Sequence, residues 1–250
     1  MLEREVRILF GKEWRQLLHS RGAMLSALLL PLLLLVIIPG LQMLGLSART
    51  TPGLNLPPGV PLPPGLQEWV NDPKAMMRAM LVPFIALGGL IVPSVTASYI
   101  LITERESRTL ELLVALPVRV GQILLAKLLA LLALASLVTV VLFSIDAVLI
   151  LALEVGSIGY VLGLLAVLLA SLTFSTTSAL LVSLLARDFR TANNINGLLI
   201  GPVILVCFLA MLVVPDPRVT SLLLAVLFAL GAGIATFVAL KVITFERLLR

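Results

Sequence analysis

Histidine, cysteine and charged residues are all scarce in this chain. The 250 residues include one histidine, His19, and one cysteine, Cys207. Asp, Glu, Lys and Arg together make up only 12% of the chain. A single cysteine excludes a disulfide bond within the chain, and no group of His, Cys and carboxylate residues has the spacing of a metal site. A soluble protein of this length could not cover its surface with so few charges, so a water-soluble globular fold is excluded as well.

The apolar residues are gathered in six long runs. They account for 60% of the chain, and the mean hydropathy is +1.15. A helix of about 20 apolar residues crosses the hydrocarbon core of a bilayer, and the period-two alternation of a membrane barrel does not occur here. We therefore predict an all-α, polytopic membrane protein with one domain over residues 1–250 and six transmembrane helices, at 23–44, 79–102, 128–153, 158–186, 195–214 and 219–240.

Two further segments flank the first span. Residues 1–20 place apolar side chains on one helical stripe and basic ones elsewhere, which predicts an interfacial helix. This helix is either a simple membrane anchor or a lever that touches a cytoplasmic partner. Residues 45–78 contain Leu-Pro-Pro-Gly twice and read as an extended outer strap with a short helix at 67–78. A spacer is the favoured function of the strap, and a loop that binds a small ligand is the alternative.

Basic residues orient the predicted bundle, because Lys and Arg collect on the cytoplasmic side of membrane proteins. With the N-terminus inside, only four of the 18 Lys and Arg residues fall in outer segments, at Arg49, Lys74, Arg78 and Arg218. The other fourteen fall in inner segments. We therefore expect both termini in the cytoplasm. The net charge of +5 follows from the same rule, and we expect no nucleic-acid partner.

Polar groups inside the spans are the candidate functional residues of the membrane region. Asp146 is the only formal charge within any of the six spans and lies near the predicted outer end of the third. It could bind a coupling ion or substrate, although a structural or gate-lining role satisfied by water or a side chain is favoured. Hydroxyl residues crowd positions 171–178, where helix packing is favoured over a polar path. Gly-x-x-x-Gly pairs at 159/163 and 197/201 permit close helix approach.

The sequence holds no recognisable nucleotide-binding or catalytic motif. Gly121 and Lys127 form a chance glycine-to-lysine pair, but the second glycine and the Ser or Thr of a phosphate-binding loop are missing. A nucleophile in the hydroxyl-rich stretch would have no plausible base near it in the sequence. We therefore expect no enzyme activity, no metal and no cofactor bound by this chain.

A short charged passage interrupts the apolar runs after the second span. It carries Glu104-Arg105-Glu106, then Thr109-Leu110-Glu111 with Leu112-Leu113, then Leu116-Pro117-Val118, and later Lys127. This order resembles the signature that follows the second span of ABC-2 type transporter permeases. Arg108 stands where the family often has Gly, and Ala126 replaces the Gly of a Gly-Lys pair. The six spans and the amphipathic start are similar too, so the resemblance covers essentially the whole chain.

The resemblance implies the membrane subunit of an exporter in the inner membrane, working as a dimer with two copies of a separate ATP-binding cassette subunit that binds ATP and Mg²⁺. Segment 103–120 would be the cytoplasmic coupling helix, and residues 1–20 the connecting helix. The resemblance assigns ATPase contacts to Glu104, Arg105, Glu106, Arg108, Thr109, Leu110, Glu111, Leu113, Leu116 and Pro117.

Similar transporters line the substrate path with the second and fifth spans of both subunits. This implies a pathway or dimer-axis role for Pro93, Ser94, Asn196, Gly197, Gly201 and Pro202. Asn193, Asn194 and Asn196 are alternatively expected to cap the start of the fifth span. The rival interpretation of the whole chain is an ion-coupled secondary transporter or channel that uses Asp146 and the hydroxyl-rich fourth span. A membrane enzyme and a scaffold without transport are less favoured.

Overall fold

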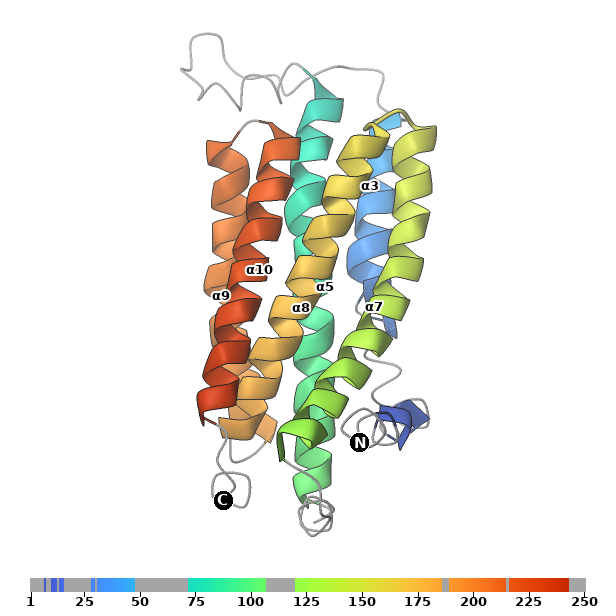
Figure 1. The fold of residues 1–250 in the computed structure, drawn as a ribbon. Coiled ribbons are helices and arrows are strands. Elements are labelled where there is room, and N and C mark those ends of the chain that lie inside the picture. Colours follow the sequence, from blue (N-terminus) through green and yellow to red (C-terminus); the bar gives the residue numbers. More distant parts are fainter. Residues whose placement is uncertain are drawn as a thin grey trace.

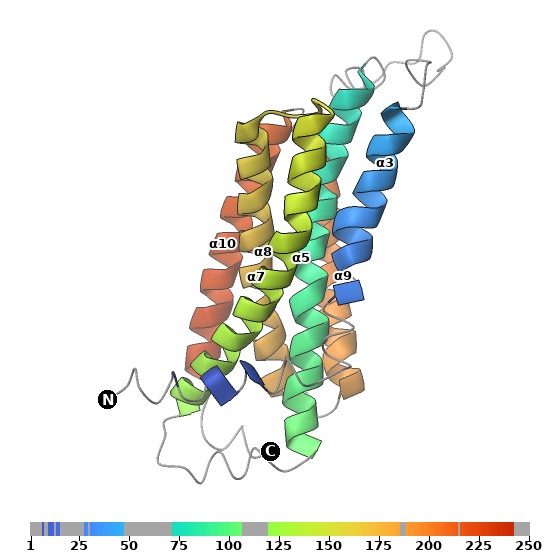
Figure 2. The ribbon, with the colours of Figure 1, turned by 90° about the vertical axis from the view of Figure 1, so that its right-hand side faces the viewer.

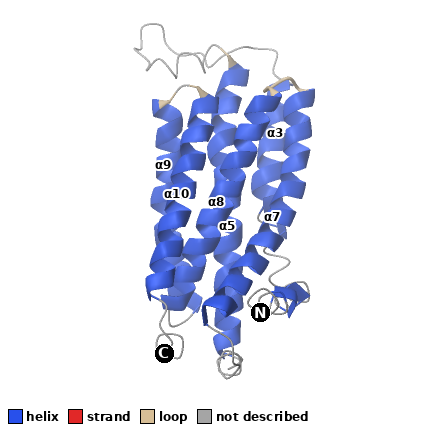
Figure 3. Ribbon diagram, viewed as in Figure 1, coloured by secondary structure: helices blue, strands red, loops and turns tan. Residues whose placement is uncertain are grey.

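The computed structural model describes a bundle of long helices. It covers residues 7, 10–12, 14–15, 28–29, 31–47, 72–106, 120–185, 189–214 and 216–242, and these contain helices, turns and short loops but no strand (Figure 3). The elements are η1 (Leu32–Ile37), α3 (Ile38–Ser47), α5 (Pro73–Glu106), α7 (Val120–Ala152), α8 (Ile158–Leu185), α9 (Phe189–Val213) and α10 (Pro217–Val242).

Two of the helices begin with the same local signal. Asp72 precedes Pro73 at the start of α5, and Asp216 precedes Pro217 at the start of α10. Each aspartate accepts a hydrogen bond of 2.9 Å from the backbone N–H two residues later. Proline suits the first helical position because its missing N–H would lack an intrahelical partner there, and the carboxylate caps a free N–H. The chain therefore specifies these two starts locally.

α8 is the central helix of the bundle. It packs most extensively against α5 and α10 and also against α7, while η1 and α3 cover α5 and α7 from the other side (Figures 1 and 2). α9 lies against α5. Large buried side chains from the central contacts include Leu35, Leu81, Ile85, Leu90, Leu164 and Leu168. The core thus lies between α5 and α8.

The described part of the N-terminal segment contacts the first half of α7. Phe10 and Trp14 stack with ring centroids 6.1 Å apart and pack against Ala130 and Leu134. Their spacing of four residues places both rings on one helical face. The apolar stripe of this segment therefore meets protein at these two positions.

Five described helices are long and apolar enough to cross a membrane. They contain the windows 73–94, 125–152, 158–182, 190–213 and 217–239, and a shorter apolar helix covers Leu32–Gly45. The very short connections expected after the third and fifth spans are confirmed, since only residues 153–157 separate α7 from α8 and only residues 214–216 separate α9 from α10. The count of six spans stays a prediction, because residues 23–27 and 30 lie outside the described part of the chain.

Two predicted boundaries are wrong. α9 begins at Phe189, so Asn193, Asn194 and Asn196 lie within the helix and do not cap it. α5 begins at Pro73 and continues without a break into the membrane-spanning part, so no separate outer helix ends at Arg78. In both cases the helix begins before the apolar run does. Polar residues at the membrane surface can form the same helical backbone hydrogen bonds as the apolar residues that follow them.

Candidate functional site

The charged passage lies between the end of α5 and the start of α7. Glu104, Arg105 and Glu106 form the last turn of α5, which ends at Glu106, and α7 begins at Val120. Figure 1 shows this end of α5 extending past the neighbouring helices. The remaining expected contacts, Arg108, Thr109, Leu110, Glu111, Leu113, Leu116 and Pro117, lie outside the described residues. Their assignment to ATPase coupling stays a prediction.

α5 meets α8 at a close backbone approach. A Cβ atom on Gly89 would lie 2.9 Å from the Leu168 carbonyl oxygen and would clash with the Ser171 hydroxyl. One turn further, the Ser175 hydroxyl donates a hydrogen bond to the Leu90 carbonyl of α5. Pro93 has no N–H, so the α5 backbone is short of a donor in this region. The Ser175 hydroxyl of α8 thus joins the two helices here.

Most other hydroxyl groups of α8 are satisfied within their own helix. Ser171, Thr173, Thr176 and Thr177 each donate to a backbone carbonyl three or four residues earlier. Ser94 on α5 does the same toward Leu90, at 3.3 Å. Helix packing, the favoured interpretation of the hydroxyl-rich stretch, is thus confirmed for Ser175.

The two Gly-x-x-x-Gly pairs differ in the structure. A Cβ on Gly163 would lie 2.6 Å from the Ser221 hydroxyl oxygen, so this glycine permits close packing of α8 on α10 within one chain. At Gly197 and Gly201 a Cβ would meet nothing within 4 Å, and both residues are exposed, as is Pro202. The second pair is therefore open to lipid or to another chain.

The other expected pathway residues do not share that open surface. Pro93 and Ser94 are buried inside the bundle, and Asn196 is 4% exposed. Gly197, Gly201 and Pro202 lie on the outward side of α9. The structure of a single chain therefore does not bring the six residues together into one site.

Asp146 is completely buried on the inward face of α7. It is 0% exposed, and neither carboxylate oxygen has a hydrogen-bond partner among the described residues. The same face carries Phe143 and Ile150, and it packs against α8, α5, η1 and α3. No described side chain satisfies this carboxyl group. Within the described part of the chain, no three His, Cys, Asp or Glu residues converge on a possible metal position.

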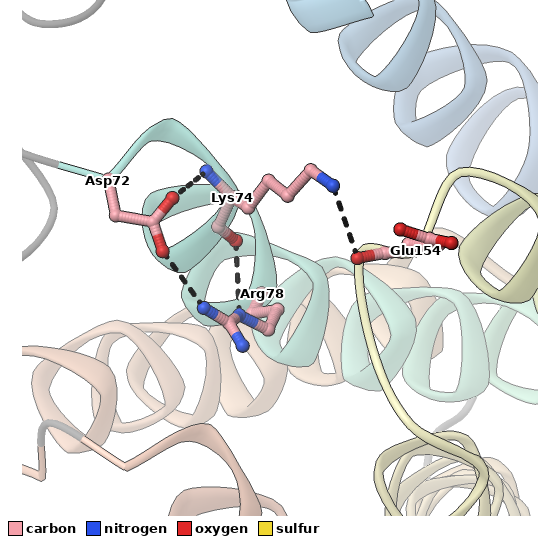
Figure 4. A network of polar contacts seen from close by, with 4 residues as sticks. All are labelled: Asp72, Lys74, Arg78 and Glu154. Atoms are coloured by element: carbon pink, nitrogen blue, oxygen red, sulfur yellow. Dashed lines mark hydrogen bonds and ion pairs between the residues drawn. The ribbon is translucent and has the colours of Figure 1, made fainter.

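A polar network ties together the start of α5, the turn after α7 and the start of α8. The Arg78 guanidinium forms a salt bridge of 3.1 Å with Asp72, and the Lys74 ammonium donates to the Glu154 carbonyl oxygen at 3.4 Å (Figure 4). The Tyr160 hydroxyl donates to the Arg78 carbonyl oxygen at 2.6 Å. Glu154 has a φ of 53°, a left-handed conformation that costs a non-glycine residue free energy. The bond from Lys74 supports this strained turn.

A pocket opens beside this network. It has a volume of about 480 Å³ and is lined by Met43, Asp72, Pro73, Lys74, Met77, Leu153 and Val155. Its walls are mostly apolar, with one acidic and one basic side chain at the edge. The sequence does not predict this pocket, because its lining comes from α3, from the start of α5 and from the turn after α7, which are far apart in the chain. The grouping of three charged residues and two Met residues at 72–78 was the available signal.

The long apolar helices and their short connections define a multi-pass membrane protein. Comparison with protein families matches residues 55–231, more than half of the chain, to the model of the ABC-2 family transporter protein. The chain therefore belongs to the ABC-2 family of membrane transport components, as its charged passage predicted. No curated protein matches the chain.

Proposed function

We propose that this chain is the membrane subunit of an ATP-driven exporter, with ATP and Mg²⁺ bound by a separate ATP-binding cassette subunit. One observation carries the proposal: the chain belongs to a transporter family, yet its sequence contains no phosphate-binding loop. ATP hydrolysis can then drive transport only through contact with another protein. Transmission of the free energy of ATP hydrolysis requires that the contact between the two proteins differ between two conformations of the membrane subunit.

The charged passage after α5 is the proposed site of that contact. α5 is one continuous helix of 34 residues, held to α8 by the Gly89 approach and the Ser175 hydrogen bond. A displacement at its inner end would therefore reach the core of the bundle. Glu104, Glu106 and Glu111 offer charges to an ATPase, and Leu110, Leu113 and Leu116 offer apolar side chains.

Two copies of the chain are proposed to meet along α9 and form the substrate path there. The exposed Gly197, Gly201 and Pro202 support this arrangement, since they leave a side of α9 without large side chains at these positions. The assembly would comprise two copies of this six-span subunit and two ATPase subunits. It would lie in the cytoplasmic membrane with both termini of the chain inside.

Charge reversal at Glu111 tests the coupling contact. Losing a charged contact at an interface costs about 2–5 kcal/mol, so Glu111→Lys should weaken co-purification of the ATPase at least ~10-fold while membrane insertion stays normal. ATP-dependent transport should fall in parallel. Glu154→Lys is the matched control, because it makes the same charge change at the opposite end of the bundle. Equal ATPase binding by wild type and Glu111→Lys, with unchanged transport, would show that this glutamate takes no part in coupling.

A second candidate function is ion-coupled transport without an ATPase. The observation that favours it is Asp146, a buried carboxyl group without a protein partner in the described residues. Purified chain in vesicles would then move substrate along an ion gradient, and Asp146→Asn would abolish this movement. Transport that requires the ATPase and ATP, with no response to ion gradients, excludes this candidate.

A further inference from the structure

Asp146 lacks a cationic partner on every element packed against it. η1, α3 and α8 contain no charged residue at all, and α7 itself has only Lys127, which lies near the other end of the helix. On α5, the cations at the outer end are Lys74, which bonds the Glu154 carbonyl, and Arg78, which pairs with Asp72. The charged residues at 104–106 lie at its opposite end. The described chain therefore supplies no counter-ion.

An unpaired carboxylate in such surroundings is expensive. Moving an ionised group into an apolar interior without a partner costs far more free energy than one hydrogen bond returns. A second protein subunit cannot provide the missing charge directly, because Asp146 is 0% exposed within a single chain. A small cation that enters between the helices can provide it.

The outer pocket lies above Asp146 on the same face of α7. Leu153 lines the pocket and is seven residues after Asp146, which is about two helical turns. The pocket volume of about 480 Å³ is that of a small-molecule site, and Met43, Met77, Leu153 and Val155 give it apolar walls. Methionine side chains adapt readily to ligands of different shape.

The packing beside α3, which covers this face of α7, leaves some space unfilled. Gly40, one turn below Met43 on α3, is buried, yet a Cβ there would meet no atom within 4 Å. Space for a methyl group is therefore left beside α3 at a level below the pocket. A small shift of α3 relative to α7 would be the least costly way to connect the pocket with Asp146.

We propose that the outer pocket and Asp146 together bind a lipophilic organic cation, with its apolar body against Met43, Met77 and Leu153 and its positive charge paired with Asp146. This names the substrate class of the proposed exporter and rests on that function. The site lies in the outer half of the bundle, so the cation would occupy it shortly before release.

Binding of two probes of equal shape and opposite charge tests the proposal. Full-length chain in lipid nanodiscs should bind radiolabelled tetraphenylphosphonium saturably, and tetraphenylborate should not displace it. Asp146→Asn should weaken tetraphenylphosphonium binding at least ~10-fold, because it keeps the shape and removes the charge. Asp146→Glu should retain binding. Ser144→Ala is the control on the same helix, since that exposed hydroxyl donates to the Val141 carbonyl at 2.6 Å.

Two further variants test the pocket itself. Leu153→Trp should fill it and weaken binding although Asp146 is intact. Lys74→Ala should strengthen cation binding by about two- to threefold, because it removes a repelling charge at the edge. An anionic ligand would show the opposite response to Lys74→Ala. Size-exclusion profiles identify any variant that fails to fold, and the comparison of the two probes on the wild-type chain does not depend on the variants.

Equal binding of the two probes to the wild-type chain would overturn the proposal, since it indicates partition into apolar space. Equal affinity of wild type and Asp146→Asn would overturn it too, and would indicate a carboxyl group that only holds a proton. These assays contain no ATP and no ATPase. Failure here with normal ATPase coupling rejects the cation site alone. If the cation binds but no ATPase co-purifies with the chain in the separate coupling experiment, the exporter assignment is rejected and the cation site stands.

Discussion

Two adjacent glycines in the middle of α5 determine how closely its neighbours approach. A Cβ on Gly88 would lie 2.5 Å from a methyl carbon of Leu35 on η1, and one on Gly89 would meet Ser171 and the Leu168 carbonyl of α8. The two contacts lie on different sides of α5 at nearly the same level. Without a side chain at either position, α5 fits between η1 and α8.

We expect Gly89→Ala to destabilise the chain. The added methyl group would meet the backbone of α8, which cannot move as freely as the end of a side chain, and overpacking of this kind costs about 1–3 kcal/mol. Thermal unfolding in detergent should begin at lower temperature than for wild type. Ser171→Ala in the same chain should recover part of the loss.

Gly233→Ala is the control for that substitution. Gly233 lies in α10, is exposed, and has nothing within 4 Å of an added Cβ, so alanine there should leave stability unchanged or raise it slightly. If Gly89→Ala unfolds at the same temperature as Gly233→Ala, the close α5–α8 approach does not matter for stability.

At the scale of whole helices, α9 and α10 contrast with α5. Two thirds of the apolar window of α5 is buried inside the chain, but only 17% of each of the α9 and α10 windows. α9 also presents Gly197 and Gly201 on its open side, while the exposed Leu198, Leu205 and Val213 give it a strongly apolar surface. These helices must meet lipid or another protein.

Gly201→Leu tests whether the open side of α9 meets lipid or another protein. If a second copy packs there, the added side chain should reduce dimer formation or transport with normal membrane insertion. Gly233→Leu adds the same bulk at an equally open position of α10 and should leave dimers intact. Single cysteines along 195–214, in a Cys207→Ala background, should cross-link between subunits on one helical face. Normal dimers and transport in Gly201→Leu, without cross-links in this span, would place the path elsewhere.

Across the whole molecule, charge is divided between the two ends of the bundle. Lys74, Arg78 and Arg218 gather at the end that carries the 153–157 turn, where Arg218 bonds the Ser157 hydroxyl at 3.0 Å. Lys127, Arg190 and Lys241 lie toward the opposite ends of their helices. In the whole sequence, only four of the 18 Lys and Arg residues belong to the segments that adjoin the end with Lys74, so the positive-inside rule predicts that this end faces outward.

Reporter fusions in a bacterial inner membrane test this orientation. Green fluorescent protein fused after Arg250 should fluoresce, since it matures in the cytoplasm, and alkaline phosphatase fused after Ser157 should be active, since it requires the outer compartment. Exchanging the two reporters provides the control and should abolish both signals. Active phosphatase after Arg250 would reverse the orientation or change the number of spans.

The sequence by itself determined the elements of this protein. Run lengths predicted the five described long helices within several residues, because in a bilayer each helix must satisfy its own backbone hydrogen bonds. The motif at 104–118 predicted the family, and it could be recognised in the sequence because its residues lie close together in the chain. The predicted start of α9 was wrong because the helix begins at Phe189, six residues before the apolar run from which the start was predicted.

Only the tertiary structure decided which faces of these helices meet. The spans are apolar on nearly all sides, so their sequences contain little information about which side is buried. Packing placed Gly163 against Ser221 but left Gly201 open, although both belong to the same sequence motif. It also joined Lys74 to Glu154 across 80 residues and buried Asp146 without a partner among the described residues. These features depend on the relative rotation of neighbouring helices, which no local sequence pattern specifies.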